Sequence, residues 1–429
     1  MTRRILFVTQ TANAWGGLEV WLDEVAPFLA SHGWEVIVAL ARGPRFHHPE
    51  AYRAAHPKLT TVDVNARALT REERVAALRQ TIGDVKPDVV VPINIADTIE
   101  AVAREKIDGR DLRLVVMLRA ITPHGELEDI RRWRDFIDVA VGGSRLLRAL
   151  IAAWAKFPDE RLRTIPPGTR RKTTNARIAK PPDRIRIAYI GRLDEHEKRV
   201  LDLIPFARAL EKRGVSYELT IAGDGPARTM LASDLDDAKF LGKVSVDELY
   251  ASVFPSIDVL MLFSTAEAGP QVVFQAMHYG VVPVVSRYRG ARAERLLRDG
   301  DTALMFDVGD AEGAAAHVER LAHDPALLER IAKSAEHAVD PQYLLDHSLQ
   351  QWRRVFDDAM TLPRAMGREL PPLRPSGLFE RLHLPATAIR KFLHRTPEPQ
   401  NPGDEWPHHG PIDDESVRRI DDLMVELDR

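Results

Sequence analysis

The chain has 429 residues, which is more than a single hydrophobic core usually organises and enough for two domains. Apolar residues make up 45% of the sequence and charged residues 29%, and this balance excludes a chain that is disordered throughout. The 60 Lys and Arg residues nearly match the 63 Asp and Glu residues, so a net charge of −3 provides no overall positive field for nucleic acid.

The lack of cysteine and of a long apolar run excludes further kinds of protein. The sequence has no cysteine, which excludes disulfide bonds, iron–sulfur clusters, thiolate zinc sites and a cysteine nucleophile. No apolar run reaches the roughly 18 residues that a membrane-spanning helix needs. The opening MTRRILFVTQ contains too short an apolar stretch for a signal peptide. We therefore expect a soluble chain.

The first 165 residues alternate short apolar runs with longer amphipathic stretches. Strands are predicted at 5–10, 34–40, 59–64, 88–93, 113–118 and 138–142. Helices are predicted between them at 17–32, 71–83, 96–106, 126–134 and 144–155. The strands are apolar throughout, with no alternation, as in a parallel sheet that is covered on both faces. This order of elements predicts an open, doubly wound α/β domain.

The same pattern restarts after a polar, proline-rich stretch, which we interpret as a linker. Later strands are predicted at 186–191, 217–223, 238–242, 258–263 and 281–286. Helices are predicted at 198–213, 226–235, 246–253, 270–279, 289–298, 311–323, 326–337 and 343–359. The predicted division is a first domain at 1–168, a linker at 169–184, a second domain at 185–342, and a helix at 343–360 that crosses back to the first domain.

The remaining residues, 361–429, are interpreted as a partly disordered or peripheral extension. Segment 364–395 has seven basic and two acidic residues, a net charge of +5, whereas 396–429 has three basic and ten acidic residues, a net charge of −7. One interpretation is a solvated appendage whose two halves attract each other. The alternative is weak contact of the basic half with an anionic membrane surface.

Glycines mark the ends of two strands. Gly16 and Gly17 follow the first strand and open a helix, where free N–H groups favour an anion. A tight turn with no ligand is the alternative. The dinucleotide fingerprint G-x-G-x-x-G is absent there, and the segment that begins at Gly223 lacks its third glycine. The sequence therefore argues against NAD as a ligand.

Charged residues follow two strands of the second domain. Arg192 and Lys198 come directly after its first strand, and two cations at a sheet edge suit a diphosphate. Glu267 precedes a helix that Gly269 and Pro270 introduce, and Gln275 lies on the second turn of that helix. The alternatives are two solvated surface cations and an acid that only complements the helix dipole.

Together these segments resemble the GT-B glycosyltransferases, specifically the retaining family 4 that uses nucleotide-sugar donors. The resemblance covers roughly residues 3–360 and rests on GGLE, SHGWEV, IPPGT, GRL-x4-K, AGDGP, FLGKVS and EAGPQVVFQAM, in this order. It implies two Rossmann-like domains that face each other across a cleft, with the acceptor on the first domain and the donor on the second. No metal or other cofactor is implied by the resemblance.

The resemblance also implies roles for single residues. Arg192 and Lys198 would bind the donor diphosphate and stabilise the charge that grows on it. Glu267 would hold hydroxyl groups of the donor sugar. Further donor-binding positions would be Gly16, Gly17, Gly223, Val244, Gly269, Pro270, Gln271 and Gln275.

Three positions depart from the family pattern. Arg199 replaces the glycine that usually follows the lysine, a change expected to alter only packing. Gln275 stands where the family has a glutamate that binds the ribose diol, which would weaken donor binding about tenfold. The family histidine after the fifth strand is replaced by Arg119, and His124 follows five residues later. Either residue is a possible contact to the sugar or the acceptor. The pairs His47–His48 and His408–His409 lack a third ligand at metal spacing and are predicted to lie in surface loops.

The expected function is transfer of a sugar from a nucleotide-diphosphate donor to a hydroxyl acceptor, with retention at the anomeric carbon. The acceptor would be a carbohydrate or a lipid-linked carbohydrate, in cell-surface polysaccharide or glycolipid assembly, in the cytoplasm or at the inner membrane face. Nucleic acid is not an expected partner. The alternatives are a sugar-nucleotide epimerase of the same fold and a non-catalytic protein that binds nucleotide sugars.

Overall fold

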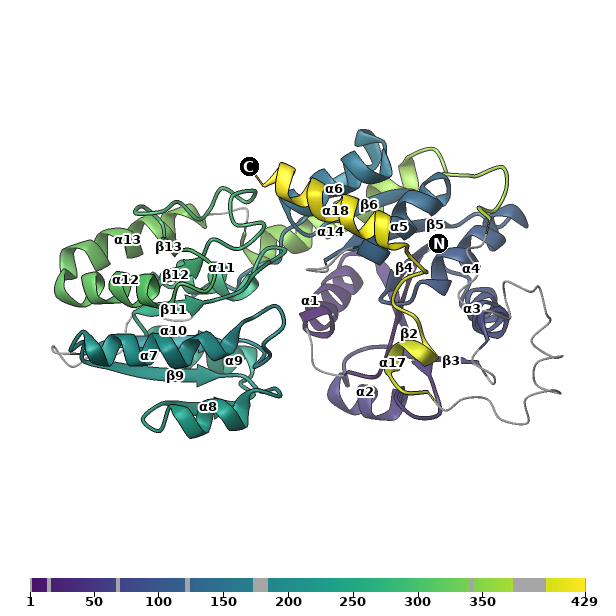
Figure 1. Cartoon of the computed structure of the whole chain (residues 1–429). Helices are drawn as coiled ribbons and strands as arrows, with labels where there is room; N and C mark the ends of the chain where they lie inside the picture. The colour runs from purple at the N-terminus through teal and green to yellow at the C-terminus, as the bar shows by residue number, and fades with distance from the viewer. Residues whose placement is uncertain are drawn as a thin grey trace. The chain divides into compact units, whose positions relative to one another are not determined.

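The computed structural model describes residues 2–13, 17–66, 70–119, 124–172, 184–339, 343–372 and 399–428. The chain divides into two compact units (Figure 1). Unit 1 comprises Met1–Gly143, Leu147–Ile165 and Leu349–Leu423, and unit 2 comprises Ser144–Leu146, Pro166–Ser348 and Met424–Arg429. Each unit is an α/β fold around a parallel sheet, as predicted.

Unit 1 contains a seven-stranded sheet in the order β3-β2-β1-β4-β5-β6-β7, with every neighbouring pair parallel. The strands are β1 Arg3–Thr9, β2 Trp34–Arg42, β3 Thr61–Asn65, β4 Val89–Ile93, β5 Arg113–Leu118, β6 Val139–Gly142 and β7 Leu162–Thr164. Six of the seven were predicted, and β7 is a short edge strand that was missed. Because the strands are parallel, their carboxyl ends share one edge of the sheet, which we call the carboxyl edge.

Helices cover both faces of this sheet. They are α1 Gly17–Ser31, α2 Pro49–Ala55, α3 Arg71–Val85, α4 Asp97–Ile107, α5 His124–Trp133, α6 Arg145–Ala155 and the 3-10 turns η1 Arg134–Phe136 and η2 Asp159–Arg161. Helix α14, Leu345–Thr361, is the predicted crossing helix, and its residues from Leu349 onward belong to unit 1. There Trp352 packs on Trp21 and Phe356 packs on Phe7, so α14 completes the core of unit 1.

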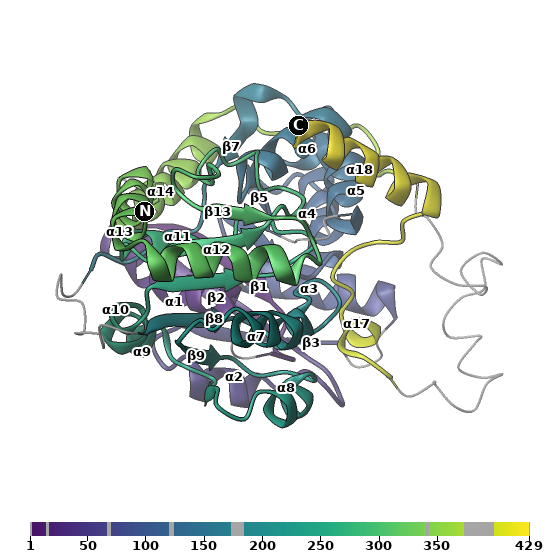
Figure 2. The ribbon, with the colours of Figure 1, turned by 60° about the vertical axis from the view of Figure 1, so that its left-hand side comes forward.

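Unit 2 contains a six-stranded parallel sheet in the order β10-β9-β8-β11-β12-β13. Its strands are β8 Ile185–Ile190, β9 Tyr217–Ala222, β10 Lys239–Gly242, β11 Val259–Leu262, β12 Val282–Ser286 and β13 Leu304–Phe306. The helical segments are η3 Val200–Asp202, α7 Leu203–Lys212, α8 Arg228–Asp234, α9 Val246–Glu248, η4 Leu249–Val253, α10 Phe254–Ser256, α11 Gln271–His278, α12 Ala311–His323 and α13 Pro325–Ala338. Figure 2 looks toward the face that α7 and α12 cover, and a separate core lies on the opposite face.

One predicted helix, 289–298, is wrong. The segment forms turns, with Gly290 and Arg295 both at positive φ. Arg289 bonds to the loop after β11 through both backbone groups, and a side chain at Gly290 would lie 2.5 Å from the carbonyl of Glu267. The carboxylate of Asp428 accepts hydrogen bonds from three N–H groups of the segment, those of Gly290, Arg292 and Ala293. These tertiary partners replace the bonds of a helix.

The extension also differs from the prediction in its described part. Residues 399–428 form α17, Pro402–Glu405, and α18, Asp414–Leu427, and they bury Glu405, Trp406 and Ile420 completely. The interpretation as a solvated appendage is therefore wrong for these residues. Most of the basic segment 364–395 lies outside the described residues. None of the helices in the described part of the chain has the length and apolar character needed to cross a bilayer.

Candidate functional site

The carboxyl edge of the unit 2 sheet gathers the loops that carry the predicted donor-binding residues. In two of these loops, glycines allow the backbones to approach each other closely. A side chain at Gly223 would lie 1.8 Å from the carbonyl oxygen of Gly191, and one at Gly225 would lie 2.5 Å from that of Leu193. The φ of Gly223 is 141°, in the region that favours glycine. Gly223 therefore lets the loops after β8 and β9 pack backbone to backbone at this edge.

Lys198 and Glu267 meet at the same edge. The Lys198 ammonium lies 2.6 Å from Oε1 of Glu267, and the hydroxyl of Ser264 donates to the same oxygen at 2.6 Å. Glu267 is only 4% exposed. A buried carboxylate needs a charge partner and hydrogen bonds, and Lys198 and Ser264 supply them to Glu267. The structure thus brings together two of the three predicted catalytic residues.

Arg192, the third, lies on the loop that follows β8. Its guanidinium is 67% exposed and pairs with Asp194 at 3.2 Å and with Glu197 at 3.8 Å. Tyr189 is buried below this loop and donates from its hydroxyl to the carbonyl of Arg192. Burial raises the Tyr189 pKa, and the charges of Glu267 and Asp194 raise it further. Arg192 is therefore an exposed cation on the loop that also carries Lys198.

Helix α11 begins at this edge. Gly269 has a φ of 94°, and Pro270 caps the helix that starts at Gln271. The first N–H groups of a helix have no partner inside it and form a natural anion site. The side chain of Gln271 donates to the carbonyl of Gly168 at 3.3 Å, so only its backbone faces outward as a potential donor to a ligand.

Gln275 is buried and already has a partner. It hydrogen-bonds to the hydroxyl of Tyr250, which also bonds Thr169 Oγ1 at 2.9 Å and the N–H of Arg170 at 3.0 Å. Burial raises the pKa of Tyr250. Gln275 therefore ties α11 to the segment that enters unit 2, a role that its sequence position did not reveal. Val244, expected near the base, is half-buried after β10 and packs on one core of the unit.

Two of the predicted donor-binding glycines follow β1, whose end lies at the carboxyl edge of unit 1. Gly16 lies outside the described residues. Gly17 is the first residue of α1, and a side chain there would meet open space. Packing therefore does not require this glycine.

Arg119 follows β5 at the same edge, with its guanidinium 5.5 Å from the centre of the Trp21 ring. Burial lowers its pKa to about 10, so it remains charged at neutral pH. Within the described residues it has no carboxylate partner, and the neighbouring residues 14–16 and 120–123 contain neither Asp nor Glu. Among the residues that the structure describes, Arg119 is thus a cation without a carboxylate partner, placed just after a strand.

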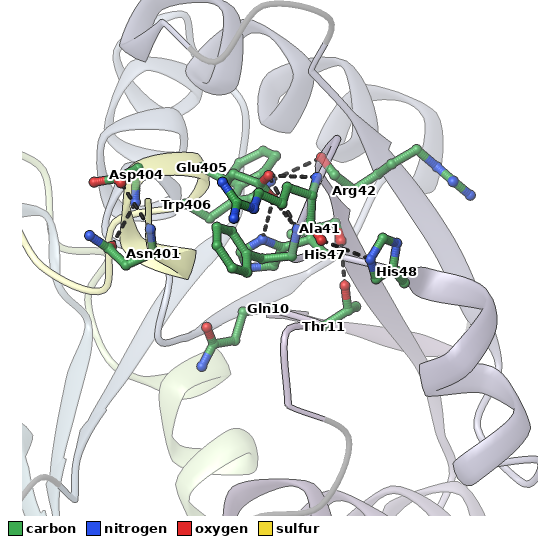
Figure 3. A network of polar contacts seen from close by, with 12 residues as sticks. Gln10, Thr11, Ala41, Arg42, His47, His48, Asn401, Asp404, Glu405 and Trp406 are labelled. Atoms are coloured by element: carbon green, nitrogen blue, oxygen red, sulfur yellow. Dashed lines mark hydrogen bonds and ion pairs between the residues drawn. The ribbon is translucent and has the colours of Figure 1, made fainter. Parts of the chain in front are cut away.

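His124 does not point freely from its loop. It is the first residue of α5, and its Nε2 lies 3.0 Å from Oδ1 of Asp421 on α18. His47 is likewise misplaced by the sequence analysis: it is fully buried and its Nδ1 lies 2.8 Å from Glu405 (Figure 3). The surface prediction holds for His48, His408 and His409, which are exposed. The described residues contain no group of three side chains suited to a metal ion.

Comparison with known proteins identifies chains that are similar in sequence to part of this one. Residues 170–338 match the family model "Glycosyl transferases group 1". N-acetyl-alpha-D-glucosaminyl L-malate synthase of Bacillus anthracis is 28% identical over 38% of this chain and 43% of its own. Lipopolysaccharide core biosynthesis glycosyltransferase LpsE of Rhizobium meliloti is 30% identical over 29% of this chain and 37% of its own. The chain therefore spans less than half the length of these relatives.

Solved structures match over more of the chain. Sucrose-phosphate synthase from Thermosynechococcus elongatus has a TM-score of 0.66 and 16% identity, over 84% of this chain and 99% of its own. Anabaena HepE in complex with UDP-glucose has a TM-score of 0.64 and 18% identity, over 84% of this chain and all of its own. At this level of identity they show the fold alone, and that fold is GT-B.

Proposed function

We propose that this chain, a GT-B protein whose second unit belongs to the group 1 glycosyl transferases, moves a sugar from a nucleotide-diphosphate donor to a hydroxyl acceptor. The observation that carries the proposal is the buried Lys198–Glu267 pair at the carboxyl edge of unit 2, beside the N-terminus of α11. An ammonium, a carboxylate and free helix N–H groups in one place suit a phosphorylated sugar.

Each group has a distinct task in this proposal. Both hydrogen bonds of the Glu267 side chain go to Oε1, so Oε2 faces the sugar hydroxyls. The Lys198 ammonium and the first N–H groups of α11 stabilise the negative charge that grows on the leaving diphosphate. Arg192 is exposed and is held only by acids of its own loop, so it turns toward the diphosphate when the donor binds.

The proposal also covers the donor, the acceptor, the stereochemistry of transfer and the place of action. The donor is a UDP-sugar, which is supported by the UDP-glucose complex of HepE. The acceptor is a carbohydrate or a lipid-linked carbohydrate, as the name of LpsE suggests. The reaction retains the anomeric configuration and needs no metal. The chain acts in the cytoplasm, where its basic segment 364–395 makes weak contact with the inner membrane face.

Binding and turnover test this function separately. UDP-glucose, GDP-mannose and ADP-glucose are each tested for thermal stabilisation, because a ligand at 100 times its Kd adds about 2.7 kcal/mol. Lys198→Ala should abolish transfer while the chain remains folded, whereas Lys212→Ala removes an exposed lysine at the end of α7 and should change nothing. Unchanged turnover of Lys198→Ala would exclude the assigned role.

Two alternatives predict different results. A sugar-nucleotide epimerase would convert the donor with no acceptor present, and NMR of the donor alone would reveal the second epimer. A non-catalytic binding protein would be stabilised by the donor yet release no nucleotide diphosphate. The anomeric configuration of the product, read from its coupling constant, tests retention.

A further inference from the structure

Residues 399–421, which we call the strap, lie against the carboxyl edge of the unit 1 sheet. Ligands of open α/β sheets bind at this edge. The strap bonds to the loops that follow β1 and β4, to the last residue of β2 and to helix α5. Its contacts are His408 to Gln10 at 2.8 Å, Trp406 Nε1 to the carbonyl of Arg42 at 3.1 Å, Pro407 to the N–H of Ala96 at 3.0 Å, and Gly410 to Asp129 at 2.8 Å.

A buried carboxylate anchors the strap. Glu405 accepts hydrogen bonds from the N–H groups of Arg45 at 2.8 Å and Phe46 at 3.2 Å, and it lies 2.8 Å from Nδ1 of His47 (Figure 3). A side chain at Gly43 would collide with this carboxylate. Loop 43–48 is therefore built around a residue of the strap, whose carboxylate supplies the hydrogen-bond partner of its N–H groups.

Two histidines of the strap, His408 and His409, follow the anchoring residue Glu405. His408 and His409 are exposed, and they lie between buried Trp406 and Gly410, whose N–H is held by Asp129. The His409 ring occupies the space in which a side chain at Gly125 would lie. Both rings are thus accessible while the backbone on either side is fixed, which is the arrangement of a preorganised binding surface.

The chemistry of this surface favours a sugar over a lipid. The two imidazoles supply hydrogen-bond donors and acceptors, and their rings supply flat faces. Gln10 is buried, and its Oε1 lies 2.8 Å from Nε2 of His408 and so fixes the orientation of that ring. The large apolar side chains that are exposed in the described part of the chain are Ile107, Met230, Val308, Met366 and Val425, none of which belongs to the strap.

We propose that His408, which Gln10 holds in position, and His409 of the strap form a saccharide-binding subsite that receives the acceptor on unit 1. The inference rests on the proposed function, since it names the part of the acceptor that this edge binds. Loop 43–48 is a positioning element of the subsite, held in place by Glu405.

Saturation-transfer NMR on the full chain with saturating UDP tests the subsite. The probes are the methyl glycosides of glucose, galactose, mannose and N-acetylglucosamine. At least one should bind, and its affinity should fall tenfold or more in His408→Ala and in His409→Ala. Both residues are exposed, so neither variant should unfold the chain. His408→Gln, which can still bond to Gln10, should restore part of the binding. His32→Ala, an exposed histidine at the end of α1, is the matched control.

Absence of binding by all four glycosides to the wild-type chain overturns the proposal, and so does binding that neither histidine variant weakens. Failure of the proposed function has a different signature. In that case UDP and UDP-sugars would not stabilise the wild-type chain, and histidine-dependent binding of a glycoside would still establish the subsite. Unchanged stabilisation by UDP in both variants shows that the loss is confined to the acceptor side.

Discussion

Asp129 makes the stability of unit 1 depend on pH in a direction that can be measured. It is 6% exposed on α5, and its Oδ2 accepts the N–H of Gly410 from the strap. Burial raises its pKa from 3.8 to about 7, and the nearby charge of Glu126 adds to the rise. The Gly410 hydrogen bond and the charges of His409 and Arg132 oppose it without cancelling it.

The direction of this pH dependence follows from the pH range in which Asp129 is protonated in the folded and in the unfolded chain. The folded chain keeps a proton on Asp129 up to a pH of about 7, whereas the unfolded chain loses it near 3.8. The stabilisation is therefore complete below pH 3.8 and is lost as the pH rises through 7. A difference of about three pKa units at 1.36 kcal/mol each amounts to about 4 kcal/mol.

Asp129→Asn removes the titration and keeps an oxygen that can accept from Gly410. The variant should resemble the wild type at pH 4 and should exceed it in free energy of unfolding by up to about 4 kcal/mol at pH 8. Urea unfolding of both chains at pH 4 to 8 measures this difference. Asp135→Asn, at an exposed side chain on η1, is the control and should show no pH-dependent difference. A difference that does not grow with pH would refute the reasoning.

Three further predictions concern other parts of the chain. Gly223→Ala should destabilise unit 2 by about 3 kcal/mol in urea unfolding, since its side chain would meet the Gly191 carbonyl; Gly214→Ala, at positive φ in open space, should cost about 1 kcal/mol. Trp406→Ala should destabilise unit 1 by about 3–5 kcal/mol and speed amide exchange in loop 43–48, because the ring is fully buried. Gln275→Glu should tighten UDP-sugar binding about tenfold in calorimetry, and equal or weaker binding would contradict a ribose contact.

The sequence was most informative where local pattern and tertiary environment agree. Mostly apolar runs predicted eleven of the thirteen strands in the described part of the chain. The pattern is clearest in inner strands such as β1 and β8, which are buried almost throughout. The missed strands, β7 and β13, are edge strands of three residues each, too short for a pattern. The helix predicted at 289–298 failed because Glu267 and Asp428 supply partners that lie far away in the chain.

The contacts of the candidate site could also be predicted only in part. Lys198 and Glu267 could be predicted to meet, because both follow strands that lie side by side in a parallel sheet. The contact of Gln275 with Tyr250 and the pairing of His124 with Asp421 could not, since nothing in either local sequence specifies the partner. The polar composition of 396–429 suggested a solvated tail, and the buried carboxylate of Glu405 shows why composition alone was insufficient.

The pairing of His47 with Glu405 determines when loop 43–48 can reach its final structure during translation. The two residues are 358 positions apart, so loop 43–48 leaves the ribosome long before its partner is made. At 5–20 residues per second this interval lasts roughly 20 to 70 seconds. During that time the N–H groups of Arg45 and Phe46 remain hydrated. The first-made sheet therefore acquires the final structure of its carboxyl edge only after Glu405 has been translated.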